Sequence, residues 1–153
     1  MTLQAALERE HRDIDDCFEV FLAADDRGAD DVLRTGCHAL RRHIYLEEVF
    51  LFPSLERRGL TMPLLVMRRE HGDLWRRMDA VESQLDEGDR PGAAAAVESL
   101  LSALASHNDK EEPVIYPEAD SGLDAAIADE LGVFLGMGVM PADWVCEQAR
   151  PHR

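Results

Sequence analysis

The chain has 153 residues, 46% of them hydrophobic, which allows one domain with a packed core and disfavours wholesale disorder. Its formal net charge of −15 argues against nucleic acid and anionic lipid as partners. Three cysteines without a C-x-x-C pair argue against a disulfide framework or a thiolate zinc site. The N-terminus lacks the pattern of a signal peptide, and no apolar run is long enough to span a bilayer, so we expect a cytoplasmic protein without a membrane partner.

Four long segments have the apolar spacing of amphipathic helices. We predict helices over residues 3–25, 30–57, 61–86 and 91–118, separated by short breaks. The first break is Asp26-Arg27-Gly28. Because short connections join antiparallel neighbours, the fold class that we predict is all-α, an up-down-up-down antiparallel four-helix bundle.

Several residues indicate how these helices begin and end. Pro53 is expected to end or bend the second helix near its last turn, and Gly59 to occupy the C-cap position after it. Thr61 is the expected N-cap of the third helix. Pro113 is expected to kink the fourth, because it has no amide N–H and crowds the carbonyl of Asp109.

The remainder of the chain is predicted to be a C-terminal helix and tail. A short helix is expected to end near Leu135, followed by an irregular stretch through Pro141, and Trp144 is expected to pin the tail to the bundle. We therefore divide the chain into a bundle over residues 1–120 and a C-terminal helix and tail over residues 121–153 that packs on it.

The two halves of the chain resemble each other. Glu10-His11 matches Glu70-His71, with an offset of 60 residues. The second match has an offset of 64 and pairs His43-x3-Glu47-Glu48 with His107-x3-Glu111-Glu112; each of its segments ends in an aromatic residue and a proline, Phe52-Pro53 and Tyr116-Pro117. Each half is thus a helical hairpin in which one helix carries a histidine and the other carries a histidine and a glutamate.

The repeated residues are predicted to meet in one layer of the bundle. Side chains four residues apart share a helix face, so His43 with Glu47, and His107 with Glu111, point in one direction. Counting residues from the helix ends, at about 1.5 Å per residue, places all the repeated residues within about one turn of the same level. The six candidate metal ligands are His11, His43, Glu47, His71, His107 and Glu111.

Such a layer favours a pair of metal ions. Burying four imidazoles and two carboxylates without compensation is costly, and two cations would offset that cost. Nitrogen and oxygen ligands without thiolate suit iron or manganese, while zinc stays open. If Glu47 and Glu111 both bridge, and an oxo or hydroxo group joins the ions, at least one coordination position is left for a small ligand.

These residues resemble the hemerythrin-like, or HHE cation-binding, domain over roughly residues 1–120. The resemblance implies two iron ions held by the six candidate ligands, in the four-His, two-Glu branch of the family. That branch includes nitric-oxide-responsive, iron-sulfur-repair and peroxide-reactive proteins. Oxygen-carrying hemerythrin has a further histidine where this chain has Met67, so the resemblance does not extend to reversible oxygen transport.

Other side chains near these positions are weaker candidates for a role at the metal site. Asp15 is a candidate for orienting His11 from behind. Met67 and Trp75 lie about one turn from His71 and can wall the site, although core packing is the favoured interpretation. We expect Glu48 and Glu112 to be outward-facing surface charges, and neither His38, off the ligand face, nor His152, in the tail, to be a ligand. Tyr45 and Tyr116 can donate to a bound oxygen species, although packing is the favoured interpretation.

Two functions, and a structural alternative, follow from this reading. The first is a di-iron protein that binds or reacts with O2, NO or peroxide, an oxidoreductase activity that would need an electron donor. The second is an iron-handling or redox- and oxygen-sensing protein without turnover. The third is a purely structural bundle with zinc or without metal. A ferritin-like site is disfavoured, because it requires two Glu-x-x-His motifs and only Glu8-x-x-His11 fits.

Overall fold

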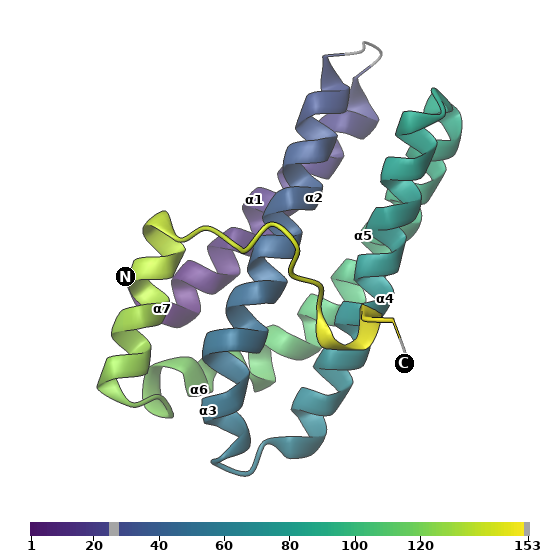
Figure 1. The fold of residues 1–153 in the computed structure, drawn as a ribbon. Helices are drawn as coiled ribbons and strands as arrows, with labels where there is room; N and C mark the ends of the chain where they lie inside the picture. The colour runs from purple at the N-terminus through teal and green to yellow at the C-terminus, as the bar shows by residue number, and fades with distance from the viewer. Residues whose placement is uncertain (25–27, 152–153) are drawn as a thin grey trace.

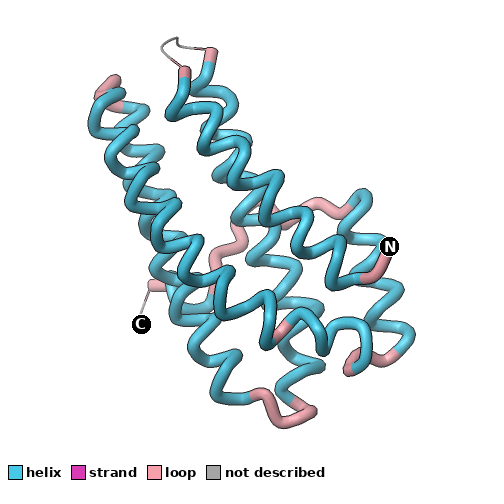
Figure 2. Tube along the Cα trace, turned by 180° about the vertical axis from the view of Figure 1, so that it is seen from behind, coloured by secondary structure: helices cyan, strands magenta, loops and turns pink. Residues whose placement is uncertain are grey.

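The computed structural model describes residues 1–24 and 28–151, and all regular structure within these ranges is helical (Figure 2). Long helical rods form a bundle (Figure 1), as the predicted all-α class requires. The elements in chain order are α1 (Leu3–Ala23), α2 (Ala29–Leu46), the π-helix η1 (Glu47–Leu51), α3 (Phe52–Glu56), α4 (Thr61–Asp86), α5 (Arg90–Val114), α6 (Tyr116–Ser121), α7 (Ala125–Met137) and the 3-10 helix η2 (Glu147–Ala149). The predicted helix end at Asp25 and the break at Asp26 and Arg27 lie outside the described residues.

The start of α1 is held by two side chains. Thr2 is its N-cap and accepts a hydrogen bond from the amide of Ala5. The carboxylate of Asp120, which lies in α6, accepts hydrogen bonds from the amides of Leu3 and Gln4. These bonds satisfy amides that have no partner within the helix, and they join α1 to α6.

The second rod is not the uniform α-helix that we predicted over residues 30–57. A π-helical stretch, η1, separates α2 from α3, and Pro53 lies in the first turn of α3. In η1 the amide of Phe52 bonds to the carbonyl of Glu47, five residues earlier, so Phe52 returns to the side of the rod that Glu47 occupies. The last helical residue of the rod is Glu56, and its C-cap is Arg57 rather than Gly59. Gly59 lies in the turn that follows, with a φ of 97° that a residue with a side chain rarely adopts.

The third and fourth rods begin and end close to the predicted residues. Thr61 is the first residue of α4 rather than its N-cap, which is Leu60 and makes no side-chain capping bond. Asp89 caps α5 by accepting from the amide of Gly92. Pro113 lies inside α5, and the expected kink takes the form of a break at Ile115, after which α6 starts at Tyr116.

The C-terminal part of the chain packs on the bundle. The predicted fifth helix is α7, which ends at Met137, two residues beyond the expected Leu135, and contacts α1, α2 and η1. The following segment crosses α2 and ends with η2 against α4 (Figure 1). Trp144 pins this segment as predicted: its ring lies 5.0 Å from that of Tyr45 and 5.6 Å from that of Trp75.

The apolar core is divided into two clusters. One contains Ile14, Phe18, Leu40 and Leu74, and the other contains Leu7, Leu46, Met67 and Ile115, among other residues. In each rod the two clusters lie on opposite sides of the predicted ligand position, so the layer of histidines and glutamates lies between them. Within residues 1–24 and 28–151, none of the helices combines the length and apolar character that crossing a bilayer requires.

Candidate metal centre

The structure brings the six predicted side chains together, although they come from every rod of the bundle. None is more than 3% exposed. His11, His43, Glu47 and Glu111 form one group, and Glu47, His71, His107 and Glu111 form the other. Within each group the potential ligand atoms all lie within 4.8 Å of one another. The two glutamates belong to both groups, so they lie between two pairs of histidines.

The distances within these groups suit metal coordination. Donor atoms that bind one first-row cation side by side, at about 2.1 Å each, lie about 3.0–3.4 Å apart. The Oε1 atom of Glu111 lies 3.3 Å from Nε2 of His11, and its Oε2 atom lies 3.4 Å from Nε2 of His107. The Oε1 atom of Glu47 lies 3.5 Å from Nε2 of His43 and 3.3 Å from Nε2 of His71. Glu111 therefore offers one oxygen to each pair of histidines, and Glu47 offers one oxygen to both.

A carboxylate lies behind each of the four histidines. Nδ1 of His43 lies 2.9 Å from Glu10, and Nδ1 of His107 lies 2.9 Å from Glu70. A carboxylate in this position fixes the ring with hydrogen on Nδ1 and leaves the lone pair of Nε2 facing the centre. Glu10 directly precedes His11, and Glu70 directly precedes His71, so each carboxylate comes from the same half as the ring that it contacts.

The other two outer carboxylates correct our prediction for Glu48 and Glu112. Neither is an outward-facing surface charge: Glu48 is 8% exposed and lies 2.7 Å from Nδ1 of His71, and Glu112 lies 3.4 Å from Nδ1 of His11. A residue next to a ligand glutamate lies about 100° further round the helix axis. In a bundle that direction faces the neighbouring rod rather than water, and the prediction overlooked this.

The electrostatics of the centre favour positive charge. Burial alone would lower the pKa of His43, but Glu47 and Glu10 outweigh it and raise that pKa to about 10. Burial is likewise outweighed at His107, where Glu111 and Glu70 raise the pKa to about 10. At Glu111, His107 and His11 overcome burial and hold the pKa well below its usual value. Protons on the imidazoles thus offset the buried carboxylates until a cation takes their place.

Tyr116 also lies at the centre, although packing was the interpretation that we favoured for it. Its side chain is fully buried, and its hydroxyl lies 2.7 Å from Nε2 of His11 and 2.8 Å from Nε2 of His43. It donates a hydrogen bond to Oε2 of Glu47 at 2.9 Å. The available signal was the repeat itself, in which an aromatic residue follows each ligand glutamate by five positions.

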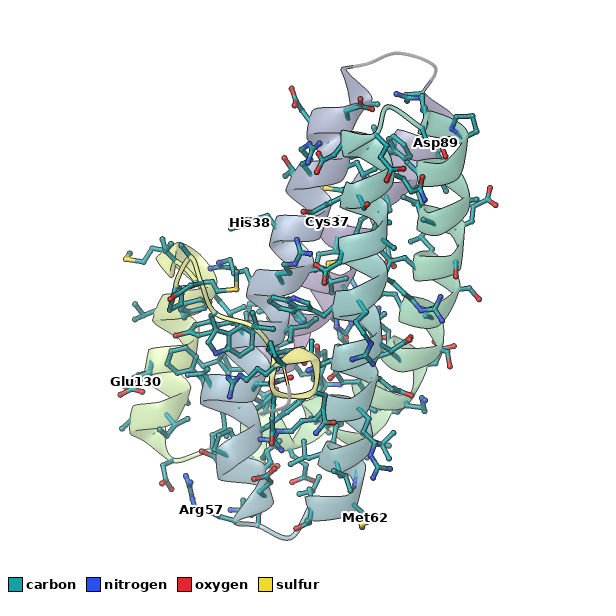
Figure 3. The ribbon with its side chains drawn as sticks, turned by 45° about the vertical axis from the view of Figure 1, so that its right-hand side comes forward. Cys37, His38, Arg57, Met62, Asp89 and Glu130 are labelled. Atoms are coloured by element: carbon teal, nitrogen blue, oxygen red, sulfur yellow. The ribbon has the colours of Figure 1, made fainter. Side chains whose placement is uncertain are left out.

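The remaining predicted neighbours lie outside the centre. Nδ1 of His11 faces Glu112 rather than Asp15. Burial raises the pKa of Asp15, although the nearby His11 opposes this effect. Met67 and Trp75 are buried in the two apolar clusters on either side of the layer, which agrees with a packing role. His38 is exposed on α2, where Figure 3 labels it, and His152 lies outside the described residues.

The residues present fit a pair of metal ions. Several of the buried atoms that face the shared centre make no hydrogen bond within the described part of the chain, namely Oε1 of Glu47, Nε2 of His71 and both carboxylate oxygens of Glu111. Unpaired buried polar atoms are uncommon in folded proteins, and bound ions are one of their ordinary explanations. All the donors are nitrogen or oxygen, the types that iron and manganese accept.

Comparison with known proteins identifies the family. The model of the hemerythrin HHE cation-binding domain matches residues 2–119. No curated protein and no solved structure matched the chain. The matched range contains all six residues of the centre and ends before α7 and η2. With a family model spanning most of its length and a buried His/Glu cluster within the matched range, the chain belongs to the hemerythrin HHE cation-binding domain family.

Proposed function

We propose that this protein holds two iron ions and binds or reacts with O2, NO or peroxide at an open iron position. In this proposal His11 and His43 hold one ion and His71 and His107 hold the other. Glu47 and Glu111 lie between the ions, which an oxo or hydroxo group also joins. We infer further that the rods alternate up and down, because their connections are short.

The observation that carries the proposal is the orientation of Glu111. Its two carboxylate oxygens face different pairs of histidines, at 3.3 Å from His11 and 3.4 Å from His107, and neither has a hydrogen-bond partner among residues 1–24 and 28–151. A single ion would leave one of these oxygens buried and uncompensated, which is costly. Two ions satisfy both oxygens and all four imidazoles.

The protein's own residues would prepare the centre in two ways. The outer carboxylates Glu10, Glu48, Glu70 and Glu112 hold the imidazole rings in the orientation and tautomer that coordination needs. The apolar clusters on either side of the layer limit the entry of water. Bound ferrous iron would supply electrons to O2 or peroxide, or a coordination position to NO.

Iron analysis of the purified protein tests the proposal. We expect two iron ions per chain, a ferric absorption spectrum, and a change in that spectrum when the reduced protein meets O2, NO or hydrogen peroxide. Glu47→Ala should lower the iron content and the absorption, whereas Glu98→Ala, on the exposed face of α5, should leave both unchanged. Full iron binding in Glu47→Ala contradicts the proposed site.

The same experiment separates the proposed reactivity from iron handling. Turnover of peroxide or NO by the loaded protein supports an oxidoreductase. Ready transfer of iron to an acceptor chelator, with no reaction toward any of the three small molecules, supports an iron-handling or sensing role instead.

A further inference from the structure

The hydroxyl of Tyr116 lies against one atom of each of three side chains that the proposed function places at one iron ion. These atoms are Nε2 of His11, Nε2 of His43 and Oε2 of Glu47, at distances of 2.7, 2.8 and 2.9 Å. All four side chains are buried, with exposed fractions of 3% or less. The phenolic oxygen therefore belongs to the innermost shell of the centre.

Hydrogen bonding accounts poorly for this arrangement once a cation replaces the imidazole protons. Glu10 and Glu112 lie at Nδ1 of His43 and His11, so in the neutral, metal-binding form each of these rings directs an Nε2 lone pair toward Tyr116. The phenol has one proton, and the structure directs it to Glu47. Three acceptors thus converge on a hydroxyl that can serve one of them. A cation among the four atoms removes the conflict, because it accepts a lone pair from each.

The spacing of the four atoms also suits a shared ion. Neighbouring ligands of an octahedral first-row cation, bound at about 2.1 Å, lie about 3.0 Å apart. The three distances from the tyrosine oxygen approach this value from below. An atom at the metal position itself would lie about 2.1 Å from each donor, so the phenolic oxygen lies at the distance of a neighbouring ligand rather than at that of the ion.

The first half of the repeat has no hydroxyl group at the position equivalent to Tyr116. Phe52 holds the position that corresponds to Tyr116, and its ring stacks on His71 with the centroids 5.4 Å apart and an angle of 13° between the planes. The ring of Tyr116 lies similarly over His11, with the centroids 5.2 Å apart and an angle of 34°. The two aromatic residues thus cover equivalent histidines, but only one of them offers an oxygen.

We propose that Tyr116 coordinates the ion held by His11 and His43 through its phenolic oxygen, and that an external small ligand therefore binds the other ion. Coordination replaces the phenolic O–H bond with an oxygen–metal bond and releases the proton to solvent, without a change of oxidation state. The ion held by His71 and His107 has one protein ligand fewer. This inference rests on the proposed di-iron function and goes beyond its six ligands.

The chain is well suited to a test, because it contains only two tyrosines, Tyr45 and Tyr116. Phenolate bound to ferric iron gives a visible charge-transfer band and phenolate vibrations in resonance Raman spectra excited within that band. We expect both signals in the ferric protein and in Tyr45→Phe, where Tyr116 is the one tyrosine left. Tyr116→Phe should lose both signals. Iron content is measured in parallel, and azide is then added to the ferric protein.

The outcomes distinguish this inference from the function on which it rests. A phenolate signal in Tyr45→Phe identifies Tyr116 as the ligand, even if Tyr116→Phe fails to fold. Two bound iron ions without a phenolate signal overturn the inference and leave the proposed function in place, whereas absence of bound iron overturns both. Azide should bind without removing the phenolate vibrations. Their loss on azide binding would assign the external ligand to the ion beside Tyr116.

Discussion

The two halves of the molecule share the positions of their ligands and differ in what surrounds them. Each half provides two histidines and a glutamate, and each has an irregular helix between that glutamate and the following aromatic residue. Tyr116 of one half has a hydroxyl at the centre, where Phe52 of the other has none. The C-terminal tail covers Glu48, while its counterpart Glu112 is partly exposed. The repeat thus sets the positions of the candidate ligands, whereas the aromatic residue of each half and the C-terminal tail make their surroundings unequal.

The largest expected effect concerns a property that the two halves share. His43 and His107 occupy equivalent positions, and in each the neighbouring carboxylates overcome burial and raise the pKa to about 10. Because the pKa of an unfolded histidine is about 6.5, the folded, ion-free protein keeps protons that the unfolded chain loses above that pH. Its free energy of unfolding should therefore fall by about 1.4 kcal/mol per pH unit for each retained proton between pH 6.5 and 8.5.

Urea unfolding of chelator-treated protein at several pH values measures this slope. His43→Asn and His107→Asn should each reduce it by a similar amount, and exposed His38→Asn should not change it. The iron-loaded protein should show a smaller slope, because bound imidazoles carry no exchangeable proton on Nε2. An ion-free protein that becomes more stable over this pH range would contradict the assignment.

The positions of the six candidate ligands were predictable because helical geometry and an internal repeat determine them. Residues four apart share a helix face, and a fixed rise per residue allows His11 and His71 to be placed at one level with the other ligands. Thr61 shows the limit of this reasoning at a helix end. Threonine is a common N-cap, but the chain enters α4 one residue earlier, at Leu60, without a side-chain cap.

The surroundings of the ligands were harder to predict, since they depend on departures from regular helices. Tyr116 reaches the centre through the break at Ile115, and residue counting along an unbroken helix does not place it there. Glu48 is buried because η1 and the tail enclose it, and the tail lies outside the repeat. Contacts between distant segments of this kind leave no periodic pattern in the sequence.

The next largest effect tests the inequality of Glu48 and Glu112. Both lie behind a histidine, but Glu48 is 2.7 Å from His71 and also accepts from the amide of Glu147, while Glu112 is 3.4 Å from His11 and its side chain is 31% exposed. Loss of such a carboxylate commonly lowers metal affinity about 10–100-fold. We expect Glu48→Gln to fall in this range and Glu112→Gln to lose less.

Competition with a chromophoric chelator, using ferrous iron under anaerobic conditions, measures both affinities. Glu118→Gln, on α6 beyond the break, serves as a control of equal charge change. Equal losses in the two variants would show that the tail adds nothing to the positioning of His71. A greater loss in Glu112→Gln would reverse the comparison.

The smallest effect concerns the packing of the C-terminal tail against α4. Gly72, next to His71, has no room for a side chain: a Cβ there would lie 2.7 Å from Cβ of Gln148 and 3.1 Å from its carbonyl carbon. In Gly72→Ala the backbone of η2 must shift, which weakens the bond from Glu147 to Glu48. Overpacking typically costs about 1–3 kcal/mol, and the gain in helix propensity of about 1 kcal/mol opposes it.

The control is Gly132→Ala in α7, where a Cβ would meet nothing within 4 Å. That variant should be more stable by up to about 1 kcal/mol, because alanine favours a helix over glycine. The two glycine variants should therefore shift the urea midpoint in opposite directions, and amide exchange of Glu147 should accelerate in Gly72→Ala alone. If Gly72→Ala is as stable as Gly132→Ala and keeps that amide protected, the tail accommodates a methyl group without losing the hydrogen bond from Glu147 to Glu48. The two halves would then differ at Tyr116 and Phe52, but not in how firmly the tail holds Glu48 behind His71.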